Sequence, residues 1–221
     1  MSEVIITVRG EHETRVAPEE AVAHLSVRAE SSERGAVVEK MSTLTAPLRD
    51  DLAARKLAGG VADWSSQRVS IWANRPWNNE GKQLALVHYG SVEVTATFTD
   101  IAALSWWISE VSERDGVQID GVTWRLTPDS ARLTEAAVAA QAVRVAVERA
   151  TAYAAALGLT DVTALEIADL GLLTHGAPES VGSPKMMRAM AMDAVGGGPA
   201  LDFQPEDIVI RAGVEARFSA Q

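Results

Sequence analysis

Apolar and polar residues alternate along several stretches of the chain, which is the pattern of strands buried on one face. The alternation is cleanest from Ala21 to Glu30. In the segment at residues 117–126 the alternation changes phase at Gly121, which predicts a β-bulge at that position. Weaker alternation and flanking turn residues predict further strands at residues 4–17, 67–73, 84–99, 117–126, 162–172 and 208–219. The turn-rich stretch between the second and third of these segments predicts that they form a hairpin.

Two other segments repeat apolar residues every three or four positions and are predicted to be helices. The first covers Glu33–Leu57, and Pro47 inside it predicts a kink. The second covers Ile101–Glu113, with Asp100 as its N-cap and Ile101 among its inward-facing residues. Together with a third, longer helix they interleave with strands that we expect to be antiparallel. The expected fold class is therefore α+β.

The third helix is the longest and is rich in alanine. It is expected to begin at Thr127 or Asp129 and to end at Gly158. Its polar residues form one narrow stripe, and mostly small residues lie opposite that stripe at Ala136, Ala139, Val143, Ala146 and Ala150. Alanine is the strongest helix former, so helix propensity alone is one explanation. We favour close packing of this helix on the sheet, with cover on more than one of its sides.

The composition predicts a folded protein with a substantial core. The chain has 221 residues, of which 47% are hydrophobic. We expect a single domain over residues 1–221 with a Gly-, Pro- and Met-rich excursion at about 174–204. The net charge of −10 argues against nucleic-acid partners, because contacts to phosphates need clustered Lys and Arg.

Three further features bear on location and redox chemistry. No segment is long and apolar enough to cross a bilayer, so we expect no membrane span. The N-terminal stretch has the pattern of a strand rather than that of a leader with a basic start and an apolar run, so we expect a cytoplasmic protein. Cysteine is absent, which excludes disulfides, thiolate metal sites and cysteine nucleophiles.

No residue pattern identifies a reaction. The histidines do not recur at the spacing of metal ligands; they are His12, His24, His88 and His175. The chain has no phosphate-binding loop, dinucleotide fingerprint or nucleophile elbow. We therefore expect no catalytic residues, no metal ligands and no cofactor, and a protein that is not an enzyme.

The tryptophans are candidates for contact with a partner, because this residue is enriched at protein interfaces. Trp106 and Trp107 point to different faces of their helix, so one of the two is expected to leave the core. We assign the candidate contacts to Trp72, Trp77 and Trp107.

A second candidate is the segment SPKMMRAMAMDAVGGGP, which contains Met186, Met187, Met190 and Met192. Thioethers favour Cu(I), although such sites usually include a spaced repeat or other soft ligands. The Gly- and Pro-rich flanks suit a flexible loop. Methionine also adapts to irregular partner surfaces. We expect this last role, a contact with another subunit or partner.

Three stretches of the chain resemble the SIMPL-domain family. They are ITVRGEHETRVAPEEAVAHLSVRAE, then DGVQIDGVTWRLTPDSARLTEAAVAAQAVRVAVERATAYAAALGL, and finally FQPEDIVIRAGVEARFSA. Bacterial members of that family are often called oxidative-stress defence or periplasmic immunogenic proteins. The resemblance covers nearly the whole chain. It implies an α+β fold, self-association and a non-enzymatic or unknown role, with no catalytic residues agreed for the family.

These observations leave three hypotheses for function. The leading one is a non-enzymatic scaffold or stress-associated binding protein that forms a homo-oligomer. The second is a binding module for a small apolar ligand or a metal ion, with its pocket under the excursion at 174–204. The third is an enzyme, which would need a polar cleft with carboxyl groups of shifted pKa.

Overall fold

The computed structural model describes residues 3–173 and 202–221. The described part divides into two compact units, each with its own sheet and helices. Unit 1 contains residues 3–17, 127–173 and 207–221, and unit 2 contains residues 18–126 and 202–206. The strands are β1 (Val4–Val16), β2 (Glu20–Ser31), β3 (Asp63–Asn74), β4 (Val87–Phe98), β5 (Val117–Arg125), β6 (Val162–Asp169) and β7 (Ile208–Ala220). The helices are α1 (Arg34–Leu57), α2 (Ile101–Ser112) and α3 (Pro128–Ala156).

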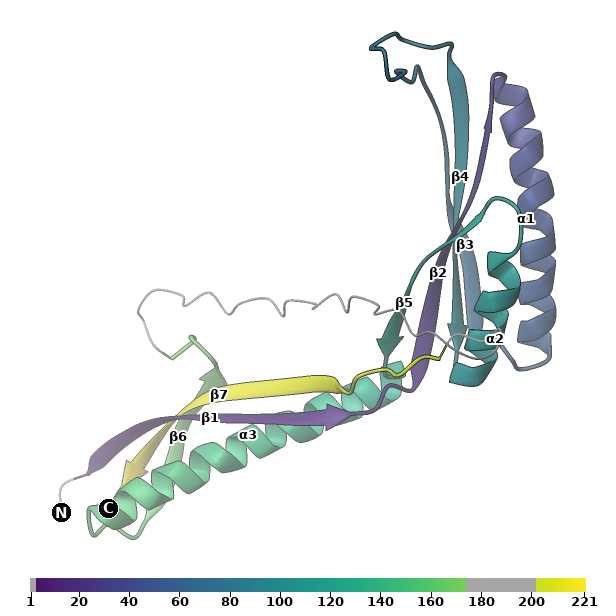
Figure 1. Ribbon diagram of the computed structural model, residues 1–221. Coiled ribbons are helices and arrows are strands. Elements are labelled where there is room, and N and C mark those ends of the chain that lie inside the picture. Colours follow the sequence, from purple (N-terminus) through teal and green to yellow (C-terminus); the bar gives the residue numbers. More distant parts are fainter. Residues whose placement is uncertain (1–2, 174–201) are drawn as a thin grey trace. The chain divides into compact units, whose positions relative to one another are not determined.

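Unit 1 is a three-stranded antiparallel sheet covered on one face by α3 (Figure 1). The strand order is β1-β7-β6, so strands from the two ends of the chain pair with each other. Ile6 lies opposite Phe218 and Gly10 lies opposite Val214, and these four residues belong to the buried face under the helix. The expected packing of the alanine-rich helix on a sheet is confirmed.

The line of α3 residues that faces the sheet differs from the expected one. The buried residues are Val138, Ala142, Ala146, Ala150 and Ala154. Each step of four residues advances by about 40° around a helix, so this line winds across the helix surface as it follows the twisted sheet. Ala136 and Ala139 of the expected line are exposed. The expectation of cover on several sides was also wrong for the described structure, since Leu133 is 68% exposed and Tyr153 49%.

This packing makes a prediction about the small residues of α3. Ala146 is fully buried, and we expect Ala146→Leu to lower the free energy of unfolding by roughly 1–3 kcal/mol, because three added carbons must fit a close-packed contact. Ala139→Leu on the same helix is the matched control and should change it by less than about 0.5 kcal/mol. Urea denaturation followed by circular dichroism measures both. Equal midpoints for the two variants would contradict the observed orientation of α3.

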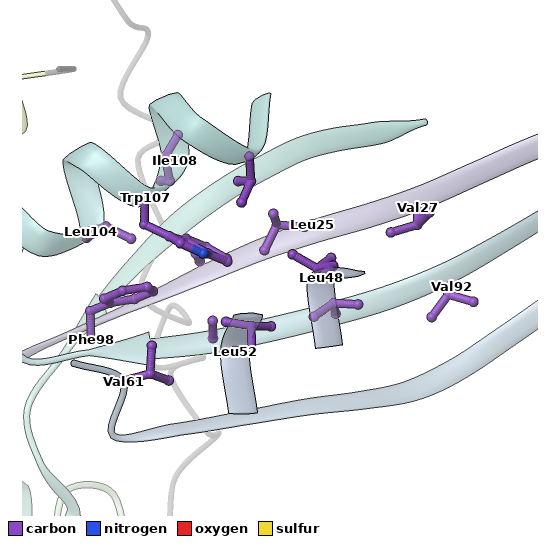
Figure 2. Packing of buried hydrophobic residues seen from close by; sticks show 14 of the residues in the cluster. Leu25, Val27, Leu48, Leu52, Val61, Val92, Phe98, Leu104, Trp107 and Ile108 are labelled. Atoms are coloured by element: carbon purple, nitrogen blue, oxygen red, sulfur yellow. The ribbon is translucent and has the colours of Figure 1, made fainter. Parts of the chain in front are cut away.

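Unit 2 is a four-stranded antiparallel sheet in the order β3-β4-β2-β5, with α1 and α2 on one face (Figure 1). Figure 2 shows the core between the helices and the sheet, where Trp107 and Leu104 of α2 lie near Phe98 of β4 and Leu25 of β2. Gly90 of β4 lies directly beneath α1. A β-carbon there would come within 2.8 Å of side-chain atoms of both Met41 and Val37, so only glycine lets the helix approach.

The expected α+β class is confirmed, and so are several local signals. The Asp100 side chain accepts hydrogen bonds from the N–H groups of Ala102 and Ala103 and caps α2. The register between β2 and β5 shifts beside Gly121, where the bulge was predicted. α1 is continuous through Pro47. Ile101 was predicted to point inward but is 38% exposed, because it is the first residue of α2 and the buried face begins a turn later.

Candidate interaction surface

The β3–β4 hairpin ends in a loop, residues 75–86, that folds on itself through hydrogen bonds. Asn78 organises its tip, because its Oδ1 accepts from the N–H groups of Glu80 at 3.1 Å and Lys82 at 2.8 Å. The backbone N–H of Asn78 donates to the carbonyl of Lys82 at 2.9 Å. Trp77 forms an isolated β-bridge with Gln83, which extends the ladder into the loop. The side chains of this loop are therefore presented on an ordered backbone.

Large apolar side chains on this hairpin face the solvent. They are Val69 (63% exposed), Trp72 (47%), Trp77 (67%), Leu84 (44%) and Leu86 (40%). We call these five residues the hairpin apolar surface; it includes both faces of the hairpin, because Val69 pairs with Val92 on the helix side of the sheet and Trp72 pairs with Tyr89 on the other side. Single exposed apolar residues are normal on a protein, but several on one protruding element are typical of an interaction site.

The orientation of Trp72 follows from the alternation of the strands. Its cross-strand partner is Tyr89, whose neighbour Gly90 lies under α1, so Tyr89 and Trp72 lie on the face away from the helices. The two rings stack with centroids 5.7 Å apart and an interplanar angle of 17°. Stacking orders the Trp72 ring before any partner arrives, which lowers the entropic cost of a contact.

The structure brings two of the three tryptophan candidates together and separates the third. Trp72 and Trp77 belong to the same hairpin. Trp107 is instead fully buried, packs against Phe98 at 5.0 Å between ring centroids, and donates from Nε1 to Asp51 Oδ2 at 2.8 Å. Its assignment as a contact residue is corrected, because a partner cannot reach it. Its neighbour Trp106, 57% exposed, is the residue that leaves the core.

Other candidates fall outside the part of the chain that the structure describes. They are the four methionines, Met186, Met187, Met190 and Met192, and nearly all of the excursion at 174–204 under which the alternative ligand pocket was expected. Sequence reasoning missed Leu84 and Leu86, because the expected strand began at residue 84. The strand begins at Val87, so both leucines lie in the loop and are free to face the solvent.

An exposed ion pair lies at the base of the hairpin. At the end of β3 remote from the loop, Lys56 Nζ donates to Asp63 Oδ1 at 2.7 Å, and this hydrogen bond, with a backbone one from Trp64, lowers the pKa of Asp63. This exposed pair links the end of α1 to β3.

Among residues 3–173 and 202–221, no group of three or more His, Asp or Glu side chains could hold a metal ion. None of the described helices is long and apolar enough to cross a membrane.

The fold and its exposed hairpin define a protein built from antiparallel sheets with helices on one face. A comparison with protein-family models then gives its relationship: residues 6–218 match the SIMPL family, described as a protein of unknown function (DUF541). The chain belongs to this family, as its sequence resemblance implied. No curated protein shows significant similarity to the chain.

Proposed function

We propose that this protein is a non-enzymatic scaffold that assembles with further copies of itself through the hairpin apolar surface. The observation that carries the proposal is the set of five exposed apolar side chains on one hairpin, two of them tryptophans. Tryptophan contributes disproportionately to binding energy when a partner buries it. The ordered loop and the stacked Trp72 ring make the surface ready for a contact without folding on binding.

The charge of the hairpin loop is compatible with a second copy as the partner. The loop at residues 75–86 contains two Lys or Arg and one Glu and so carries +1, the hairpin from Asp63 to Phe98 is neutral as a whole, and the chain carries −10. An apolar loop of slight positive charge is not repelled by another copy of an acidic protein, so the loop is the part of the hairpin best suited to the encounter. A stress-associated role for the assembly is supported by the resemblance of the chain to oxidative-stress defence proteins.

The proposal predicts that removing the two hairpin tryptophans weakens assembly. We expect the double variant Trp72→Ser, Trp77→Ser to raise the dissociation constant of the oligomer at least about tenfold, because tryptophans in protein interfaces are frequent hot spots. Sedimentation velocity over a range of concentrations measures this, and circular dichroism checks that the fold is retained.

Trp106→Ser is the matched control, because Trp106 is exposed to a similar degree but belongs to α2. It should leave the oligomer unchanged. If the hairpin variant assembles as the unmodified protein does, or if Trp106→Ser weakens assembly equally, the hairpin is not the contact and the proposal fails.

A further inference from the structure

Unit 1 contains a hollow of about 470 Å³ between β1 and the first half of α3. Its volume lies in the range of small-molecule sites. α3 contacts the sheet most closely at Gly10, where the helix backbone of Ala142 and Ala146 leaves no room for a β-carbon. His12 and Thr14 continue the same face of β1 beyond that contact, and the hollow opens above them.

The polar side chains around the hollow are hydrogen-bond donors. They are His12, Thr14, Thr134, Gln141 and Arg144. Arg144 Nη1 donates to Gln141 Oε1 at 3.0 Å, which holds the guanidinium and leaves the amide nitrogen of Gln141 as a further donor. No lining residue is acidic, although the chain carries a net charge of −10.

Among the residues that the structure describes, some arginines pair with a carboxylate and others, Arg144 among them, do not. Arg9, Arg55 and Arg125 all pair with carboxylates. Within residues 3–173 and 202–221, no carboxylate lies within ion-pair distance of Arg144. A guanidinium surrounded by neutral donors favours an anion, and a carboxylate matches its planar fork.

The other wall of the hollow is apolar and includes Leu133, Ala137 and Val138. Leu133, Ala137, Gln141 and Arg144 follow one another at helical spacing, so they form a single stripe on α3 that is apolar at one end and cationic at the other. The stripe extends about 16 Å along the helix axis from Leu133 to Arg144, and its part from Ala137 to Arg144 extends about 10 Å. This arrangement fits a small molecule with a carboxylate head and a short aliphatic chain.

We propose that this hollow is a binding site for a short-chain monocarboxylate. The carboxylate pairs with Arg144 beside the amide of Gln141, and the aliphatic chain packs along Ala137 and Val138. The site is made wholly of unit 1 residues and is separate from the hairpin apolar surface, so the two proposals stand or fall independently.

Titration of the full chain with hexanoate tests the proposal, with hexanol as the probe that lacks the charge. We expect hexanoate to bind with a dissociation constant on the order of a millimolar, as suits a ligand of few atoms. Hexanol should bind at least tenfold more weakly. Nuclear magnetic resonance should show shifts at the Val138 methyl groups and the His12 ring.

Arg144→Gln should weaken hexanoate binding at least tenfold. Arg132→Gln is the matched control, because Arg132 lies on the same helix, exposed, and pairs only with Asp129 among the described carboxylates. It should bind hexanoate as the unmodified chain does. Absence of shifts at Val138 and His12 with excess hexanoate overturns the proposal. Equal binding of hexanol, or full binding by Arg144→Gln, does the same.

Discussion

Replacing Gly10 by valine is expected to lower the free energy of unfolding by about 3–5 kcal/mol, the range of the most severe single substitutions. A β-carbon at Gly10 would lie 2.1 Å from the carbonyl oxygen of Ala142 and 2.6 Å from the backbone nitrogen of Ala146. Both atoms belong to the backbone of α3 and cannot rotate away as a side chain can. The helix must therefore move off the sheet and lose part of the buried contact around Ala142, Ala146 and Ala150.

Gly35→Ala is the control for adding a β-carbon to a glycine that has free space around it. Nothing lies within 4 Å of a β-carbon built at Gly35, which is exposed in the first turn of α1. This variant should be neutral or more stable by up to about 1 kcal/mol, since alanine favours a helix. Chemical denaturation followed by far-ultraviolet circular dichroism compares the two. A Gly10→Val protein with an unchanged midpoint would show that α3 does not pack as described.

Trp107→Ala is expected to destabilise unit 2 by about 3–5 kcal/mol. The side chain is fully buried between the helices and the sheet, next to Phe98 and Leu104 (Figure 2). Its removal leaves a large cavity and also removes the N–H donor that binds Asp51 Oδ2. Arg55 still pairs with the other oxygen of Asp51 at 2.9 Å, so the carboxylate does not become isolated.

The adjacent residue supplies the control for this prediction. Trp106→Ala removes the same side chain from a position that is 57% exposed, and should change stability by less than about 0.5 kcal/mol. All six tryptophans of the chain belong to unit 2, so the remaining tryptophan fluorescence reports the unfolding of that unit. If the two variants unfold at the same urea concentration, the assignment of Trp107 to the core is wrong.

Local signals in the sequence were enough to predict most elements of the fold. The phase change at Gly121 marked the bulge, and Asp100 marked the start of α2. Thr127 caps α3, accepting a hydrogen bond from the N–H of Ser130, and Gly158 follows its end with a φ of 76°. These features can be predicted from the sequence because each depends on the backbone conformation of a few neighbouring residues.

Pairing between distant strands could not be derived in this way. β1 and β7 lie at opposite ends of the sequence, yet they pair along their whole length. Nothing in the pattern of either strand selects the other. The buried line of α3 was misplaced for a related reason: it depends on the path of the helix over a twisted sheet, so only part of the line, Ala146 and Ala150, was identified.

The candidate surface was predicted in part. Trp72 and Trp77 were chosen because tryptophan is enriched at interfaces, and both are exposed on one hairpin. Trp107 was chosen over Trp106 although helical spacing shows only that the two face different ways. Which of them faces the sheet depends on how α2 packs, and that is a tertiary property. The hollow beside Arg144 was not foreseen, because its residues come from β1 and α3.

The central claim, assembly of this protein with itself, is tested most directly by native mass spectrometry of the untagged chain. Each chain has a mass of 23.5 kDa. At micromolar concentration we predict a dominant species at a whole-number multiple of that mass, two or greater. A single species at the monomer mass would contradict the account.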